Sequence, residues 1–292
     1  MIPDISEFSY GFALTNELVG WVALSAAPVF PSLIEEGKKG GGYDVKLDRP
    51  GAPLYLQFKR AECMMRASAY EIKKHGLPLD VPFYRFPITQ RNKSFQHTSL
   101  VELDDGTNLV FYAAPRFHTI NEINRAWQNG DVSARSIFVA PSTIGLIHDN
   151  EKHAVSYDRR HTFFCSEPRE IKALSAMDLA ERIQAQVSSD SRPVRDMLPE
   201  WLDNIRERRS RARDTQEKIT AEIEAEAPGR RGVLEGVTIR TVSIQAQEEP
   251  VGRSPEVRSG RRLSAEEQTL REISDEAMHG FGAQFFVVQP LE

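Results

Sequence analysis

Segments of helical periodicity alternate with short apolar runs over the first part of the chain. Apolar residues spaced three and four apart predict helices at 15–26, 62–75 and 119–129. The first of these helices would begin at a cap formed by Thr15 or Asn16. Because strand-like runs separate the helices, we expect one α/β or mixed α+β domain over residues 1–170.

One of the strand-like runs carries polar residues on a single face. In residues 54–59 alternate side chains point to opposite faces of a strand, so that one face is apolar and the other carries Tyr55, Gln57 and Lys59. The segment before it contains three glycines and Asp44 and is joined to it by a Pro-Gly turn. We therefore expect a hairpin in which Asp44 lies on the neighbouring strand, near Gln57 and Lys59.

Further strands are predicted along the same domain. The run at 109–115 has the composition of a buried strand and ends at a proline. The sequence Asp-Asp-Gly-Thr-Asn at 104–108 separates this run from the apolar run before it and indicates a second hairpin. Strands are also expected at 133–141, 144–149 and 153–168.

The second half of the chain is rich in helix-forming residues. From residue 170 to 227 we expect two helices, separated by a break at 188–193. A Ser-x-x-Glu capping pattern at Ser264 begins a last helix, which ends near Gly280. A terminal strand at 283–289 follows the helix, and we expect it to add to a sheet because a single strand is not stable by itself.

These elements divide the chain into three regions. We expect a domain over 1–170, a helical region over 171–232, and an extension of loop, helix and terminal strand over 233–292. A strand candidate at 237–246 offers the terminal strand one pairing partner, and the main sheet offers the other. The expected fold class is mixed α/β or α+β, with a helical C-terminal half.

Composition limits the location and the partners of the protein. The chain has 292 residues, of which 40% are hydrophobic, and it contains no run of about 18 apolar residues that would span a membrane. The N-terminal residues lack a basic stretch followed by an apolar one, so we expect a cytoplasmic protein. The formal charge of −5 gives no overall attraction to nucleic acid, so such contacts must be local or supplied by a partner.

Cysteine and histidine do not indicate a zinc site. The two cysteines are too few for a disulfide framework and are expected to be buried free thiols. His148, His153 and His161 lie close in sequence to Asp149 and Cys165, but their spacing matches no zinc-ligand pattern.

The hairpin residues suit a different metal. Mg²⁺ prefers oxygen ligands, and one carboxylate, one amide oxygen, a phosphate oxygen and water make a sufficient set. A lysine beside such an ion can orient the attacking water and offset the charge that develops on phosphorus. In this sequence Gln57 follows Asp44 by 13 residues, and Lys59 completes a Gln-x-Lys pattern.

This pattern resembles the PD-(D/E)xK nuclease superfamily, in the variant that has Gln in place of the middle acid. The resemblance implies a restriction-endonuclease-like core sheet flanked by helices. It also implies that Asp44 and Gln57 bind Mg²⁺ or Mn²⁺ and that Lys59 is the catalytic lysine. Glu17, on the preceding helix, matches the acid that many such nucleases carry there. The expected activity is metal-dependent hydrolysis of phosphodiester bonds, in DNA rather than RNA, and by association a role in bacterial phage defence.

Several cations near this motif are candidates for nucleic-acid contacts. Arg60, Arg66, Lys73 and Lys74 follow the hairpin and would hold a phosphate backbone if they face it, although a solvated helix face explains them equally well. An arginine-rich belt at 206–213 is a further candidate for contacts with DNA or RNA. We favour a solvated face with intrahelical pairs, or a surface for a partner helix.

An alternative reading remains open. Replacing an acid by Gln57 removes a negative ligand and weakens metal binding unless Glu17 or a substrate phosphate compensates. The same fold would then serve as a catalytically silent binding or assembly subunit, which the acidic net charge and the helical second half favour. Glu17 would in that case be only an acid near a helix N-terminus. A monomer, a homodimer and a subunit of a larger complex are all compatible with the sequence.

Overall fold

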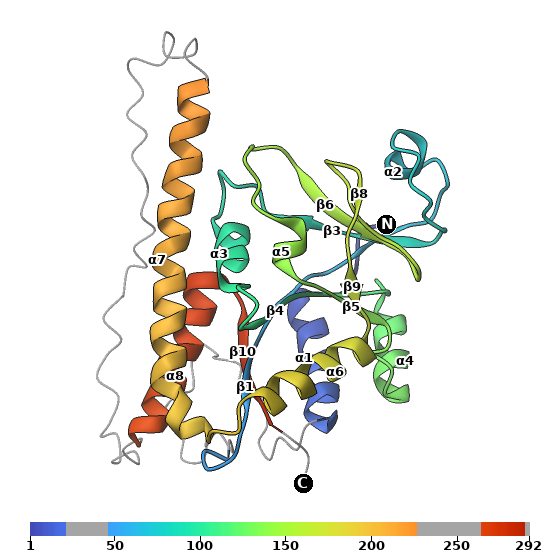
Figure 1. The fold of residues 1–292 in the computed structure, drawn as a ribbon. Helices are drawn as coiled ribbons and strands as arrows, with labels where there is room; N and C mark the ends of the chain where they lie inside the picture. Colours follow the sequence, from blue (N-terminus) through green and yellow to red (C-terminus); the bar gives the residue numbers. More distant parts are fainter. Residues whose placement is uncertain (22–45, 227–263, 290–292) are drawn as a thin grey trace, which may run out of the picture.

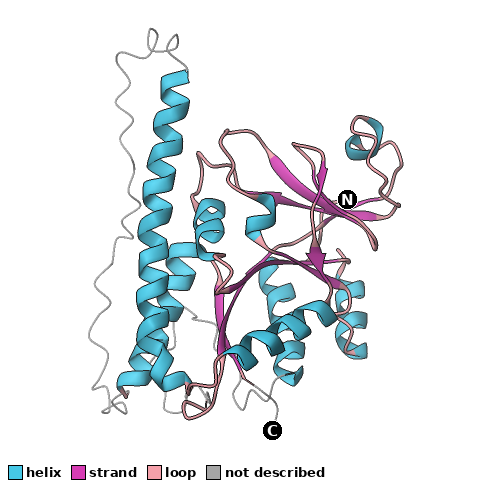
Figure 2. Ribbon diagram, viewed as in Figure 1, coloured by secondary structure: helices cyan, strands magenta, loops and turns pink. Residues whose placement is uncertain are grey.

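The fold is mixed α+β, with two sheets and helices around them (Figures 1 and 2). The structure is a computed structural model, and it describes residues 1–21, 46–226 and 264–289. Each sheet has five strands. Within the described residues, no helix has both the length and the apolar character needed to cross a lipid bilayer.

The first sheet brings the N-terminal and C-terminal parts of the chain together. Its strand order is β10-β1-β4-β5-β9. Strands β1 and β4 are parallel to each other, and the other neighbours are antiparallel. The bounds of its strands are β1 (Ala52–Phe58), β4 (Leu109–Pro115), β5 (Ser136–Val139), β9 (Ala173–Leu174) and β10 (Gln284–Val288).

The second sheet is antiparallel throughout, in the order β2-β3-β6-β7-β8. It lies above the first sheet in Figure 1, on the side opposite to α1 and α6. The bounds of its strands are β2 (Glu62–Met64), β3 (Phe83–Ile88), β6 (His153–Tyr157), β7 (Thr162–Phe164) and β8 (Arg169–Glu170).

Helices cover both faces of the first sheet. One face packs on α1 (Glu7–Trp21), α4 (Ile120–Asn129) and α6 (Ala176–Ser189). The other face packs on the second sheet and on a group of helices, among which the long α7 stands at the edge of the molecule in Figure 1. These are α3 (Gln96–Leu103), α5 (Pro141–Ile144), α7 (Val194–Glu226), α8 (Ala265–Glu276) and a π-helical turn (Ala277–Phe281); the short α2 (Tyr70–Lys73) lies at the far end of the second sheet.

Alternating residues of the first sheet supply two separate hydrophobic cores. Leu56 and Phe111 point toward α1, α4 and α6, whereas Tyr55 and Tyr112 point toward the second sheet, α7 and α8. Every residue of β4 is buried, as expected for a strand covered on both faces. The two faces predicted for β1 are therefore confirmed, and both are inside the protein.

The predicted hairpin at β1 is not formed. One edge of β1 pairs with β10, with Ala52 opposite Val288 and Leu56 opposite Gln284. The other edge pairs with β4. Both edges of β1 are therefore occupied by strands distant in sequence, and the expectation of a hairpin neighbour was wrong. Asp44 lies outside the described residues.

The predicted helix at 62–75 was also wrong. Residues 62–64 form β2 and pair with β3, and only the four residues of α2 are helical. The guanidinium of Arg85 on β3 holds the segment by binding Glu62 at 2.5 Å and Glu71 at 2.7 Å. Pairing between residues distant in sequence has here overridden a local helical pattern. The hydrogen bonds between β2 and β3 and the ion pairs of Arg85 form only in the folded chain.

Three other expectations are corrected. Helix α1 begins at Glu7, so Thr15 is a buried residue within the helix and not its cap. The residues before the turn at 104–108 form α3, so the turn joins a helix to β4 and not two strands. In place of a strand at 144–149, the chain has α5 and irregular backbone.

Other predictions are confirmed. The structure contains β4, α4 with a capping box at Thr119, both helices of the 170–227 region and the capping box at Ser264. The terminal strand forms as β10 and joins the main sheet. Because β9 and β10 both belong to this sheet, the regions beyond residue 170 share its core. The candidate strand at 237–246 lies outside the described residues.

We expect Phe111→Ala to lower the free energy of unfolding by about 3–5 kcal/mol, because it removes a ring that is 2% exposed at the centre of one core. Urea unfolding followed by circular dichroism measures the change. Phe95→Ala is the matched control, because that ring is 55% exposed, and its change should stay within about 0.5 kcal/mol. Equal losses in the two variants would contradict this description of the core.

Candidate functional site

Gln57 and Lys59 lie at the C-terminal end of β1 on the face that points toward the second sheet. They follow Tyr55 on that face, and Gln57 lies beside Tyr112 of β4. Lys59 continues the strand pairing by donating its backbone N–H to Ala113 O at 2.8 Å. The side chains are almost completely buried, with exposures of 8% for Gln57 and 6% for Lys59. The predicted pair is therefore brought together, inside the protein.

A residue not anticipated from the sequence, Gln96, connects the two. Its Nε2 donates to Gln57 Oε1 at 2.9 Å, and its Oε1 accepts from Lys59 Nζ at 3.3 Å. Gln57 Nε2 donates to the backbone oxygen of Phe58 at 3.1 Å. Gln96 is the first residue of α3, and because the run that follows it was expected to be a strand, no local signal pointed to it.

Lys59 is a buried cation without an anionic partner among the described residues. Burial lowers the pKa of Lys59, and the negative charge of Glu7 has a smaller effect in the opposite direction. No carboxylate of the described residues lies within 4.0 Å of its ammonium group. Its Nζ lies 5.5 Å from the centre of the Tyr112 ring, which supplies a cation–π contact. Lys59 Nζ is thus held in a buried site by an amide oxygen and an aromatic face.

His97 forms a second layer behind this group. Its ring is stacked on Tyr112, its Nδ1 lies 2.8 Å from the Tyr112 hydroxyl, and its Nε2 lies 2.8 Å from Gly145 O. Because a carbonyl only accepts, Nε2 carries the proton and Nδ1 accepts from the tyrosine. Burial lowers the pKa of His97 from 6.5 to about 4, so the ring is neutral at pH 7. The network fixes the ring of Tyr112 under Lys59.

Gly282 closes the site from the C-terminal part of the chain. It follows the π-helical turn and has φ of 64°, the left-handed conformation in which glycine has no Cβ penalty. A Cβ at this position would lie 2.1 Å from Gln96 Nε2 and 3.2 Å from Gln57 Oε1. The backbone therefore approaches the two amides closely, and π-helical turns frequently occur at functional sites.

Glu17 is not part of this cluster. Its carboxylate accepts from the backbone N–H of Val132 at 2.7 Å and of Ser133 at 3.2 Å, and from the Ser133 hydroxyl. Helix α1 covers the opposite face of the first sheet from Lys59. Glu17 holds the loop that follows α4, and it cannot share a metal ion with Gln57 in this arrangement.

The basic residues singled out from the sequence are on the surface but do not converge on Lys59. Arg60, Arg66, Lys73 and Lys74 are all exposed. The Lys74 ammonium donates to the Tyr70 hydroxyl at 2.6 Å and lies over the same ring. Helix α2, which ends at Lys73 and has Lys74 as its C-cap, is distant from α3 in Figure 1.

The arginine belt of α7 holds the fold together. Arg206 binds Glu272 of α8 at 2.8 Å, and Arg209 binds Glu276 of the same helix. Arg208 binds Asp105, in the turn before β4, at 2.5 Å. Only the pair Arg211–Glu207 follows the intrahelical pattern expected from the sequence. Most of this belt therefore joins α7 to its neighbours.

The chain matches no protein-family model, no curated protein and no solved structure in the three comparisons made. The geometry of the site is thus the only guide to its chemistry.

The described donors do not by themselves fit a magnesium ion. Gln57 Oε1 is the one uncharged oxygen that β1 directs into the site, and it already accepts a hydrogen bond from Gln96. Among the described residues, no group of three His, Cys, Asp or Glu side chains is arranged to hold a metal. Mg²⁺ needs at least one carboxylate in most protein sites, and the sequence pattern assigns that ligand to Asp44, which lies outside the described residues.

The histidines grouped in the sequence are structural. His153 Nε2 lies 2.6 Å from Asp149 Oδ1, and its Nδ1 contacts the Ser166 hydroxyl. The ring is stacked on Phe164. His161 contacts Asp158, and the thiol of Cys165 is buried and free. Among the described residues, these side chains form no group of three or more that could hold a metal ion.

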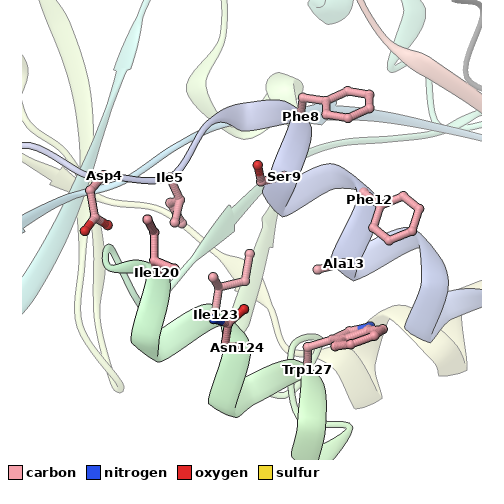
Figure 3. Close-up of a pocket in the computed structure, with 10 residues that line it drawn as sticks. All are labelled: Asp4, Ile5, Phe8, Ser9, Phe12, Ala13, Ile120, Ile123, Asn124 and Trp127. Atoms are coloured by element: carbon pink, nitrogen blue, oxygen red, sulfur yellow. The ribbon is translucent and has the colours of Figure 1, made fainter.

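A second concave surface lies on the other side of the first sheet. A groove of about 460 Å³ runs between α1 and α4 and is lined mainly by Phe8, Phe12, Ile120, Ile123 and Trp127 (Figure 3). The Trp127 and Ile120 side chains are 51% and 53% exposed. The lining is mainly apolar, with Asp4, Ser9 and Asn124 as its polar residues, and it suits contact with an apolar surface.

We expect stability to fall as the pH is lowered from 6.5 to 4 because of His97. Its pKa is lower in the folded protein, so the unfolded chain binds more protons in this range and acid favours unfolding. The contribution is roughly 3 kcal/mol at most, from a shift to about 4. Urea unfolding at several pH values measures how the free energy of unfolding changes with pH. Between pH 6.5 and 4 this free energy should fall less steeply for His97→Gln than for the wild-type protein. His279→Gln, at an exposed histidine, is the control and should keep the wild-type slope.

We expect Gly282→Ala to destabilise the protein more than Gly130→Ala. Both glycines have φ near 65°, so both variants incur a left-handed backbone cost of about 1–2 kcal/mol. A Cβ at Gly130 meets nothing within 4 Å, whereas one at Gly282 displaces Gln96 and costs its two hydrogen bonds, roughly another 1–2 kcal/mol. Thermal unfolding of the pair measures the difference. Equal losses would show that Gly282 does not position Gln96.

Proposed function

We propose that this chain is a metal-dependent nuclease that hydrolyses phosphodiester bonds, in DNA rather than RNA, with a restriction-endonuclease-like core built on β1. The observation that carries the proposal is the buried ammonium of Lys59, beside Gln57, with no carboxylate partner among the described residues. A desolvated cation without an anion is costly unless it serves a ligand of opposite charge. The phosphodiester group supplies that charge.

Lys59 has the position that such chemistry requires. During hydrolysis, negative charge increases on the non-bridging oxygens of the phosphate as water attacks phosphorus. A fixed ammonium group in a water-poor site stabilises this charge more strongly than one in bulk water. The ring of Tyr112, held by His97, keeps Lys59 in place. The chain thereby contributes a preorganised positive charge at the end of a rigid strand.

The metal is the part of the proposal that depends on Asp44. Mg²⁺ or Mn²⁺ bound by Asp44 and Gln57 would supply charge neutralisation and an activated water. By the same association that suggests the nuclease, we propose a cytoplasmic enzyme of bacterial phage defence. Arg60, next to Lys59 and exposed, is the basic residue best placed to contact the adjoining nucleic-acid backbone.

A second candidate function is a catalytically silent binding or assembly subunit, as a homodimer or with another protein. Its support is that the side chains of Gln57 and Lys59 already form hydrogen bonds with Gln96 of the same chain. The apolar groove between α1 and α4 adds a surface suited to a protein contact (Figure 3). In this case the Gln-x-Lys strand is retained for packing alone.

We expect the purified protein to nick plasmid or single-stranded DNA in the presence of Mg²⁺ or Mn²⁺ and not in EDTA. Asp44→Ala and Lys59→Ala should each reduce the rate by about 100-fold or more, because each removes a charge that acts on the reacting phosphate. Gel electrophoresis of the time course measures the rates.

Two further variants serve as controls for that experiment. Lys172→Ala removes an exposed lysine near Asp178 of α6, which covers the other face of the first sheet, and this variant should cleave at the wild-type rate. Glu17→Gln should also retain activity, because Glu17 lies across the sheet from Lys59. Absence of cleavage by folded wild-type protein would favour the binding subunit. Cleavage that survives Lys59→Ala would place the active site elsewhere.

A further inference from the structure

Gln96 is the outermost member of the buried amide cluster. Gln57 and Lys59 are 8% and 6% exposed, whereas Gln96 is only partly buried. Its neighbour Phe95 is 55% exposed, so this end of α3 faces solvent. The side chain of Gln96 therefore stands between the two functional groups and the surface. A ligand that enters from this end of α3 meets Gln96 first.

The contacts of Gln96 duplicate those of a ligand. Its Oε1 accepts a hydrogen bond from Lys59 Nζ at 3.3 Å. An anionic oxygen of a ligand would bind Lys59 Nζ at the same place. The Nε2 of Gln96 donates a hydrogen bond to Gln57 Oε1 at 2.9 Å. Gln57 Oε1 is the atom that the proposed function assigns to the metal. One neutral side chain thus blocks both groups at once.

We propose that Gln96 is a displaceable amide that fills an oxyanion site at Lys59, and that an incoming phosphate oxygen takes the place of Gln96 Oε1. The identity of that anion as a phosphodiester rests on the proposed function. The existence of the oxyanion site rests on the burial of Lys59 and on the geometry of Gln96.

The relative strength of the two contacts favours displacement. A hydrogen bond between an ammonium and an anionic oxygen is shorter and roughly twice as strong as one to a neutral partner. The contact of Lys59 with Gln96, at 3.3 Å, is longer than a charge-assisted bond. A phosphate oxygen is the better partner for this ammonium.

The backbone allows Gln96 to leave without unfolding α3. Gln96 is the first helical residue, and its backbone N–H is held by the Ser94 hydroxyl at 3.2 Å. Rotation of the side chain therefore changes no helical hydrogen bond. Gly282 limits the direction in which the Gln96 side chain can rotate, because the Gly282 backbone already lies against Gln96 Nε2. Displacement of Gln96 then frees Lys59 and Gln57 together. Binding of an anion to Lys59 is thereby coupled to the release of Gln57 Oε1 from its hydrogen bond with Gln96.

The test uses inorganic phosphate as the probe, with isothermal titration calorimetry and the shift of the melting temperature, on full-length protein without metal. Wild-type protein should bind phosphate, and Gln96→Ala should bind it about fivefold tighter, because the neutral hydrogen bonds no longer compete. Lys59→Met should abolish binding. Gln184→Ala, at an exposed glutamine, is the matched control and should leave the affinity unchanged.

A second variant guards against loss of folding in Gln96→Ala. Gln96→Glu keeps the size of the side chain and places a carboxylate against Lys59, so it should remain folded and bind no phosphate. Unchanged or weaker phosphate affinity in folded Gln96→Ala would overturn the inference, as would binding that persists in Lys59→Met or Gln96→Glu.

The same variants separate this inference from the nuclease. Phosphate binding with the expected Gln96 effect, but without DNA cleavage, would support the oxyanion site and reject the nuclease. Cleavage that depends on Lys59, with no change of phosphate affinity in Gln96→Ala, would support the nuclease and reject the role of Gln96.

Discussion

The arrangement of the protein depends on the pairing of β1 along both edges. Hydrogen bonds to β10 on one side and to β4 on the other satisfy its backbone, so β1 is an internal strand covered on both faces. A strand in that position cannot shift its register by one residue without moving Tyr55 and Leu56 into the wrong cores. The position of Lys59 is therefore fixed by pairings formed along the whole strand, and it lies inside the protein.

The C-terminal part of the chain completes the site that the N-terminal part begins. Strand β10 pairs with β1, and Gly282, just before it, lies against the amides of Gln57 and Gln96. Helix α8 is in turn held to α7 by the pairs of Arg206 and Arg209 with acids. The arginines that resembled a nucleic-acid surface in the sequence thus act on the site indirectly, since they position the element that supplies Gly282.

The sequence predicted what local patterns determine. Alternation gave the two faces of β1, helical periodicity gave α4, and the capping pattern at Ser264 gave the start of α8. It did not predict the neighbours of β1, because the pairing of Leu56 with Gln284 joins residues from opposite ends of the chain and has no local signal. The same limit applies to the site: Gln57 and Lys59 were found from their spacing, whereas Gln96 and Gly282 reach them only through tertiary packing.

The glutamine at position 57 determines the electrostatics of this site. A carboxylate there would lie on the same face as Lys59 and would offset its charge, so the lysine would retain a pKa nearer its ordinary value. With the neutral amide, the ammonium is left with Gln96 Oε1 and the ring of Tyr112, and burial lowers its pKa. Loss of the negative ligand weakens the hold on a cation and at the same time strengthens the attraction for an anion. For the function that we propose, this composition implies that the phosphate group binds first and that a metal ion would bind more tightly with that phosphate as an additional ligand.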